Sequence, residues 1–155
     1  MTLRAANAKL AAVADSLKGT WDLVAWRRIA ADGTVSYPLG ADARGQLIYT
    51  ADGIMAVQIT AEGRPTVPTD DPLGGDTAAR AGAYSTYLAY FGTYEVSGEQ
   101  VIHHLDGSLF PNWSGEEQAR DLACEDGDLV LRTPPMQLAD GTTVVNELAW
   151  SRGKP

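Results

Sequence analysis

Apolar and polar residues alternate in short runs from residue 19 to residue 152, which is the period of strands with one buried face. Asp-Gly pairs, typical of tight hairpin turns, stand between several of these runs. The runs lie at residues 20–26, 45–50, 54–59, 94–96, 101–105, 118–125, 128–133 and 143–152. The pattern therefore predicts about eight short antiparallel strands, nearly all joined in sequence by hairpin turns.

An amphipathic helix is predicted at the N-terminus, over residues 3–18. Its apolar residues recur at i, i+3, i+4 and i+7 between Leu10 and Leu17, and Gly19 can end it. A helix this short needs a packing partner to persist, so we expect it to dock on the rest of the protein.

A second helix is predicted over residues 78–91, after a loop of residues 61–77 that is rich in Pro, Gly and Asp. Gly92 can end this helix. Tyr84 and Tyr87 lie on one face of it, together with two other apolar side chains. This face can pack on the sheet, or the loop and helix can form a lid whose tyrosines face a ligand, and the two interpretations are compatible.

Eight strands in sequence order would leave two unpaired edges in an open sheet. Closure into an up-and-down barrel removes both edges, and a barrel of eight strands is just wide enough to hold one small ligand. We therefore predict an all-β fold in a single domain of residues 1–155. It is an eight-stranded antiparallel barrel with an N-terminal helix and a helix or lid between strands three and four.

Composition narrows the range of partners. The net charge of -8 and the pI of about 4.6 argue against nucleic acid and anionic membrane surfaces, since both need a basic face. No apolar run is typical of a signal peptide or a membrane span, so we expect a cytoplasmic protein that binds a small molecule; its oligomeric state stays open. Cys124, the single cysteine, is expected to be a small buried apolar residue.

Several motifs together resemble a known family. Gly19-x-Trp21 is similar to the opening strand of lipocalins. The other matching motifs are Tyr37-Pro38-Leu39-Gly40, Gly45-x-Leu47-x-Tyr49-Thr50, Gly92-x-Tyr94-x-Val96, Thr133-Pro134-Pro135 and Leu148-x-Trp150-x-Arg152. Over residues 16–152 the chain resembles the bacterial and fungal lipocalin-like domain proteins, which implies a lipocalin-like barrel. Some small barrels of this general kind act in natural-product pathways as cofactor-free cyclases or isomerases.

The resemblance also implies how one end of the barrel closes. In lipocalins the opening Trp packs inside the closed end, against an Arg of the last strand. This implies that Trp21 and Arg152 form a cation–π pair, and that Leu23 and Ala25 point inward with Trp21.

Two adjacent histidines, His103 and His104, lie on one predicted strand. They must face opposite sides of it, so they cannot both reach one metal ion inside the barrel. No other residues have the spacing of a metal or nucleotide site, and we predict no metal and no cofactor. The apolar neighbours do not decide which histidine faces inward, and the family resemblance favours His103. A single inward histidine can also ligate haem, an alternative that the absence of Soret absorption would exclude.

Taking the apolar face of each strand as the inner face brings several polar and aromatic side chains inside together. They are Tyr49, Tyr94, His103, Gln118, Arg120 and Asn146. An arginine is rarely buried without a partner, yet Asp22, Asp121 and Glu147 fall on outer faces. Arg120 is then satisfied by carbonyls, tyrosine hydroxyls and water, or it waits for an oxygen atom of a ligand.

These side chains predict a site inside the barrel. The catalytic candidates are His103 as acid or base, Arg120 as the group that stabilises an oxyanion, and Tyr49 as a hydrogen-bond donor. A loop of residues 108–116 can fold over the barrel mouth, or bury its aromatic side chains outside the barrel. The predicted ligand-binding residues are Trp26, Met55, Tyr84, Tyr87, Tyr94, Phe110, Trp113, Gln118, Asn146 and Trp150.

Two functions fit this site. The first is a cofactor-free cyclase or isomerase that acts on a small, mostly apolar, oxygenated metabolite. The alternative is a non-catalytic protein of the lipocalin-like type that binds or carries such a molecule. Replacing His103 or Arg120 by Ala would abolish turnover in the first case, whereas a carrier needs no group that transfers a proton.

Overall fold

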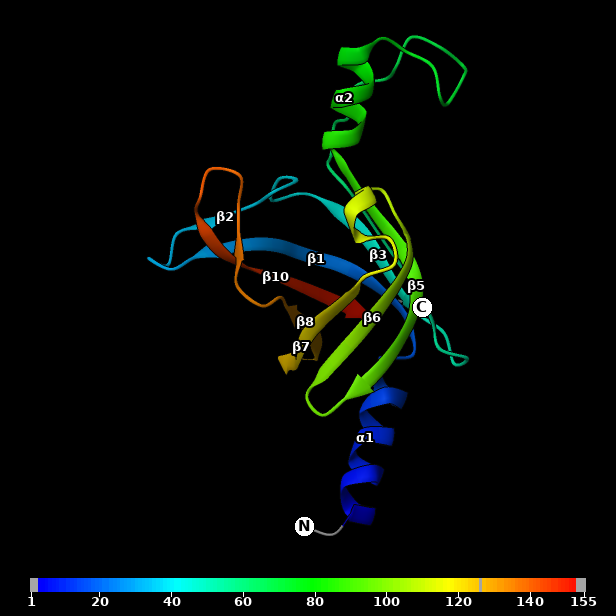
Figure 1. Ribbon diagram of the computed structural model, residues 1–155, viewed down its shortest axis with the longest axis vertical. Coiled ribbons are helices and arrows are strands. Elements are labelled where there is room, and N and C mark those ends of the chain that lie inside the picture. Colours follow the sequence, from blue (N-terminus) through cyan, green and yellow to red (C-terminus); the bar gives the residue numbers. More distant parts are fainter. Residues whose placement is uncertain (1–2, 126, 153–155) are drawn as a thin grey trace.

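The computed structural model describes residues 3–125 and 127–152, and about half of them belong to one antiparallel sheet (Figure 1). Eight strands pair in the ring β1-β3-β4-β5-β6-β7-β8-β10, and the pairing of β1 with β10 closes the ring. These strands are β1 Gly19–Ala30, β3 Arg44–Tyr49, β4 Ile54–Thr60, β5 Tyr87–Ser97, β6 Gln100–Ser108, β7 Glu117–Glu125, β8 Asp128–Arg132 and β10 Thr143–Arg152. The predicted all-β, eight-stranded barrel is therefore confirmed.

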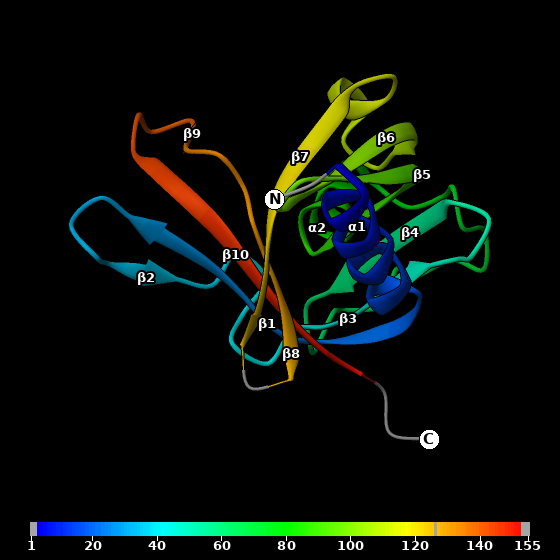
Figure 2. The ribbon, with the colours of Figure 1, turned by 90° about the horizontal axis from the view of Figure 1, so that it is seen from below.

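Two short strands lie outside the ring. β2 (Val35–Ser36) pairs with β1, and β9 (Met136–Gln137) pairs with β10. Seen from below, these strands and the adjoining ends of β1 and β10 extend to one side of the barrel (Figure 2). They lengthen the wall beside the upper opening.

The two longer helices lie at opposite ends of the barrel (Figure 1). α1 (Leu3–Leu17) matches the predicted N-terminal helix and reaches the lower end, while α2 (Thr77–Ser85) stands at the upper end. A short 3-10 helix, η1 (Pro111–Trp113), follows β6. No helix within the described residues has the length and apolar character needed to cross a membrane.

The second helix is shorter than predicted, because residues 87–91 belong to β5 and not to a helix. Their aromatic and apolar side chains also suit a strand, and pairing with β4 satisfies their backbone groups. Gly92 therefore does not end a helix but lies within β5, where a Cβ would overlap the carbonyl oxygen of His104 on β6. The glycine permits the close approach of these two strands.

A β-bulge in β1 changes which side chains face the interior. Leu23 pairs with Trp150 and Ala25 with Ala149, so Val24 is the extra residue and is 46% exposed. The inward direction predicted for Ala25 is wrong, because the bulge shifts the alternation by one residue. Trp26 and Arg28, two residues apart, are turned inward instead.

The lower end of the barrel is closed as the family resemblance implied. The guanidinium carbon of Arg152 lies 4.2 Å from the ring centroid of Trp21, and the Trp21 indole N–H donates to the Leu17 carbonyl at 2.8 Å. Arg152 also donates to the carbonyls of Ser16 and Lys18 at the end of α1. These contacts hold the end of α1 against the barrel floor.

One expectation about the core is wrong. Cys124 is exposed, although we expected a buried residue. It lies beyond Asp121, the last residue of β7 that pairs with β6, so only β8 flanks the strand at this point. Alternation alone does not show where a strand extends past its neighbour.

Candidate functional site

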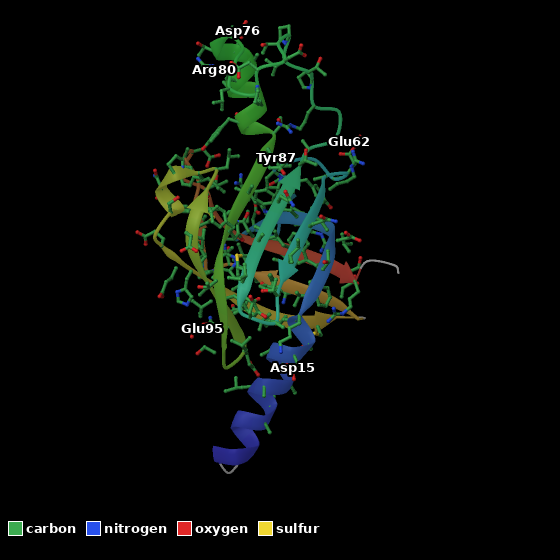
Figure 3. All side chains as sticks on the ribbon, turned by 90° about the vertical axis from the view of Figure 1, so that its right-hand side faces the viewer. Asp15, Glu62, Asp76, Arg80, Tyr87 and Glu95 are labelled. Atoms are coloured by element: carbon green, nitrogen blue, oxygen red, sulfur yellow. The ribbon has the colours of Figure 1, made fainter. Side chains whose placement is uncertain are left out.

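A cavity of about 690 Å³ occupies the barrel interior above the packed floor. Its wall is mostly apolar and aromatic, and α2, η1 and the segment before β9 contribute to its rim. Figure 3 shows Tyr87, which lines the cavity, at the end of β5 nearest α2, and Glu95 at the opposite end of that strand. The cavity therefore lies toward the α2 end of the barrel.

The structure brings most of the predicted site residues to this cavity. Those that line it are Trp26, Tyr84, Tyr87, His103, Phe110, Trp113, Gln118, Arg120, Asn146 and Trp150. Tyr49 and Met55 are instead buried in the core, and Tyr94 is partly buried and packs against Tyr49. These three predicted residues do not line the cavity, because alternation identifies the inner face of a strand but not the depth of a side chain.

His103 and Tyr49 form a buried pair beside the cavity. Each is 1% exposed, and the Tyr49 hydroxyl lies 2.6 Å from Nε2 of His103. Burial, helped by the positive charge of Arg120, lowers the pKa of His103 from 6.5 to about 3. Burial raises the pKa of Tyr49 well above 10, so both groups are neutral at physiological pH.

The tautomer of His103 follows from this pair. The neutral Tyr49 hydroxyl has a proton to donate, and Nε2 is the partner that the described residues provide. Nε2 then accepts, so the ring proton resides on Nδ1. Nδ1 is buried and has no hydrogen-bond partner among the described residues.

Arg120 lies on the strand next to His103 and is 6% exposed. Its guanidinium donates to the Ala119 carbonyl at 2.8 Å and to the Gln118 side-chain oxygen at 3.3 Å. Within residues 3–125 and 127–152, no carboxylate forms an ion pair with it. Neutral acceptors therefore solvate a cation whose charge stays uncompensated.

Sequence reasoning missed a second arginine in the cavity. Arg28 donates from Nε to the Asn146 side-chain oxygen at 3.3 Å, and its guanidinium lies 5.8 Å from the Trp26 ring centroid. The Trp26 indole donates to the same Asn146 oxygen at 2.9 Å. Burial lowers the pKa of Arg28. Only the bulge at Val24 would have revealed this residue, and the sequence carries no clear sign of a bulge there.

Aromatic rings connect the rim to the depth of the site. The Trp113 ring meets the rings of Phe110 and Tyr90 edge to face, with centroid distances of 5.5 Å and 5.8 Å. The ring centroid of Tyr90 lies in turn 6.0 Å from that of His103. The predicted rim loop thus turns its aromatic side chains toward the cavity and not onto the outside of the barrel. Such rings form a rigid, flat-sided wall.

The acidic residues near these strands point outward. His104 lies 3.1 Å from Glu117 and 3.5 Å from Glu95 on the outer surface. Glu147 pairs at 2.8 Å with Arg27 and also at 2.8 Å with Arg132. The part of the chain that the structure describes holds no group of three or more His, Cys, Asp or Glu side chains that could bind a metal ion.

Known proteins of several kinds are similar to this chain. A curated relative is the 4'-hydroxy-3'-methoxypropiophenone carrier protein ppsC of Aspergillus oryzae, 29% identical in an alignment 106 residues long that covers 63% of this chain and 96% of the relative. Two crystal structures of the fluorescent protein UnaG, the wild type and a point mutant, are 15% and 14% identical, with TM-scores of 0.39 and 0.38. Each covers 90% of this chain, which in turn covers 98% and 97% of them. A family model described as "Lipocalin-like domain" matches residues 18–153, and the chain therefore belongs to the lipocalin-like domain family.

Proposed function

We propose that this protein binds a small, mostly apolar, oxygenated aromatic metabolite in the barrel cavity and carries it unchanged. The observation that carries the proposal is the cavity of about 690 Å³, whose aromatic wall holds a few polar groups. The size and lining suit a ligand of one or two rings. The curated relative is named as the carrier of an aryl ketone with hydroxyl and methoxy groups, which supports the same ligand class here.

The chemistry of His103 favours carriage over catalysis. A base works best when its pKa is near the working pH, and the pKa of His103 is lowered to about 3. Its Nε2 atom is also engaged by Tyr49. Cyclase or isomerase activity, a role in biosynthesis and a cytoplasmic location stay predictions.

The direct test is titration of the protein with 4'-hydroxy-3'-methoxypropiophenone. Trp26, Trp113 and Trp150 line the cavity, so we expect saturable quenching of tryptophan fluorescence. Chromatography and mass spectrometry should recover the compound unchanged after long incubation. Conversion to another compound would contradict passive carriage and favour an enzyme.

A pair of variants on β10 shows whether binding occurs in the cavity. Leu148→Phe fills part of it, and we expect affinity to fall about tenfold or more because the ligand loses room. Val145→Phe is the matched control on the opposite face of the same strand and should bind like the wild type. Equal affinity of both variants would place the ligand outside the barrel.

A further inference from the structure

We propose that the cavity recognises an anionic oxygen of its ligand, a carboxylate or a phenolate, through the positive charges of Arg28 and Arg120. This inference rests on the proposed function, since it assumes that the cavity holds a small aromatic ligand. It adds the charge of the species that binds and the groups that select it.

The charges of the cavity are the first argument. Two arginines, Arg28 and Arg120, line it, and no Asp or Glu is among its lining residues. This contrasts with the whole chain, whose net charge is -8. Within the described residues, the hydrogen bonds of both guanidinium groups go to neutral oxygens, which belong to Asn146, Gln118 and Ala119. A buried cation is costly unless an anion or hydrogen bonds compensate it, and a negatively charged ligand would supply the missing charge.

The side-chain amide oxygens of the cavity already accept hydrogen bonds. The Gln118 side-chain oxygen accepts from Arg120, and the Asn146 side-chain oxygen accepts from both Trp26 and Arg28. These amides are the ones that would otherwise accept a hydrogen bond from a ligand hydroxyl. The remaining capacity of this part of the wall is therefore to donate.

Two unpaired donors lie behind the same wall. Nδ1 of His103 and Nε1 of Trp150 are buried without a hydrogen-bond partner in the described part of the chain, and other atoms of both residues line the cavity. An indole nitrogen can only donate, and the pairing of His103 with Tyr49 leaves Nδ1 as a donor. An anionic oxygen can accept from several such donors at once, whereas a neutral hydroxyl must also donate its own proton.

Four probes with the same aromatic ketone body test the proposal. They are 4'-hydroxyacetophenone, measured at a pH where it is ionised, its methyl ether 4'-methoxyacetophenone, 4-acetylbenzoate, and the methyl ester of that acid. We expect at least one anion to bind about tenfold or more tightly than its neutral methyl derivative. The same preference lowers the pKa of bound 4'-hydroxyacetophenone by about one unit, which its phenolate absorption reports.

Charge-removing variants locate the effect. Arg120→Gln and Arg28→Gln should each reduce the preference for the anion over its neutral methyl derivative about tenfold. Arg27→Gln is the matched control, because Arg27 is next to Arg28 on β1 but pairs with Glu147 on the outer surface. Arg28 is half-buried near the rim, so its variant gives a result even if Arg120→Gln does not fold.

The outcomes separate this inference from the proposed function. If the neutral derivatives bind as tightly as the anions, the inference is overturned and the carrier proposal stands. If none of the probes nor 4'-hydroxy-3'-methoxypropiophenone binds, both are overturned. If only the phenolate or only the carboxylate binds more tightly than its methyl derivative, the inference is supported, and the result shows which anionic group of the ligand the cavity recognises. Equal loss of anion binding in Arg27→Gln would indicate a general field effect and would overturn the assignment to the cavity.

Discussion

His103 and Tyr49 show how burial fixes the protonation state of a single pair. The two side chains come from β6 and β3, on different parts of the barrel wall, and they meet in the core at 2.6 Å. Burial disfavours the charged form of each, so the pKa of the imidazole falls while that of the phenol rises. The pair therefore stays neutral over a wide pH range and leaves Nδ1–H of His103 buried without a partner among the described residues.

This pair predicts that His103 does not titrate between pH 5 and pH 8. In nitrogen NMR spectra we expect one protonated ring nitrogen, Nδ1, throughout that range. The unfolded chain binds a proton near pH 6.5 and the folded chain only near pH 3, so stability falls as pH falls through this window. The loss is about 1.4 kcal/mol for each pH unit in which only the unfolded form is protonated. His103→Asn should flatten this slope, and a His103 ring that gains a proton near pH 6.5 in the folded protein would contradict the argument.

Which residues face inward was predictable where strands are regular. Period-two alternation, with the family resemblance, placed His103 and Arg120 inside and Glu147 outside. Arg28 was missed, because one extra residue at Val24 reverses the alternation without leaving a mark in the hydrophobic pattern. The prediction of inward-facing residues therefore fails where the backbone is irregular. Here the bulge at Val24 adds the positive charge of Arg28 to the cavity.

At the scale of elements, the residues at the boundary between α2 and β5 fit both the hydrophobic period of a helix and that of a strand. Tyr84, Tyr87 and Leu88 fall on one helical face, yet Tyr87 and Leu88 pair with β4 as a strand. A run of aromatic and apolar residues satisfies both patterns over a few positions, and only pairing with a neighbouring strand decides between them. The number of strands was predictable from turns, whereas this boundary depends on a long-range contact.

The contact between β5 and β6 at Gly92 predicts a strong effect of a single methyl group. Gly92→Ala places a Cβ against the His104 carbonyl, so the strands must separate, and we expect a loss of about 1–3 kcal/mol in urea unfolding. Gly82→Ala is the control, since Gly82 lies in α2 with open space around it and alanine favours helices. A Gly92→Ala variant as stable as the wild type would show that the strands adjust freely.

At the scale of the whole molecule, Arg152 joins the last strand to the first helix. It covers the Trp21 ring and donates to two carbonyls at the end of α1, so the end of β10 meets the C-terminal end of α1 at the floor of the barrel. The family resemblance indicated the Trp21–Arg152 pair. The hydrogen bonds to α1 were not predictable, because they depend on how the helix ends at the barrel floor.

Removing the contacts of Arg152 with Trp21 and α1 should destabilise the barrel floor. Arg152→Met keeps part of the apolar stem but loses the cation–π contact and the hydrogen bonds, and we expect a loss of about 1–3 kcal/mol in urea unfolding. Arg44→Met, which removes an exposed ion pair with Glu62, should cost less than about 1 kcal/mol. Similar losses of unfolding free energy in Arg152→Met and Arg44→Met would mean that the contacts of Arg152 stabilise the fold no more than an exposed ion pair does.

The sealed floor has a consequence for how cargo is exchanged. Leu17, Trp21 and Arg152 block passage at the α1 end, so a molecule that enters beside α2 has to return along the path by which it came. If the protein carries a ligand as proposed, uptake and release both use the opening beside α2. Tyr84 and Phe110 line the cavity near that opening, so we expect their replacement by Ala to change the rates of binding and release more than the equilibrium affinity.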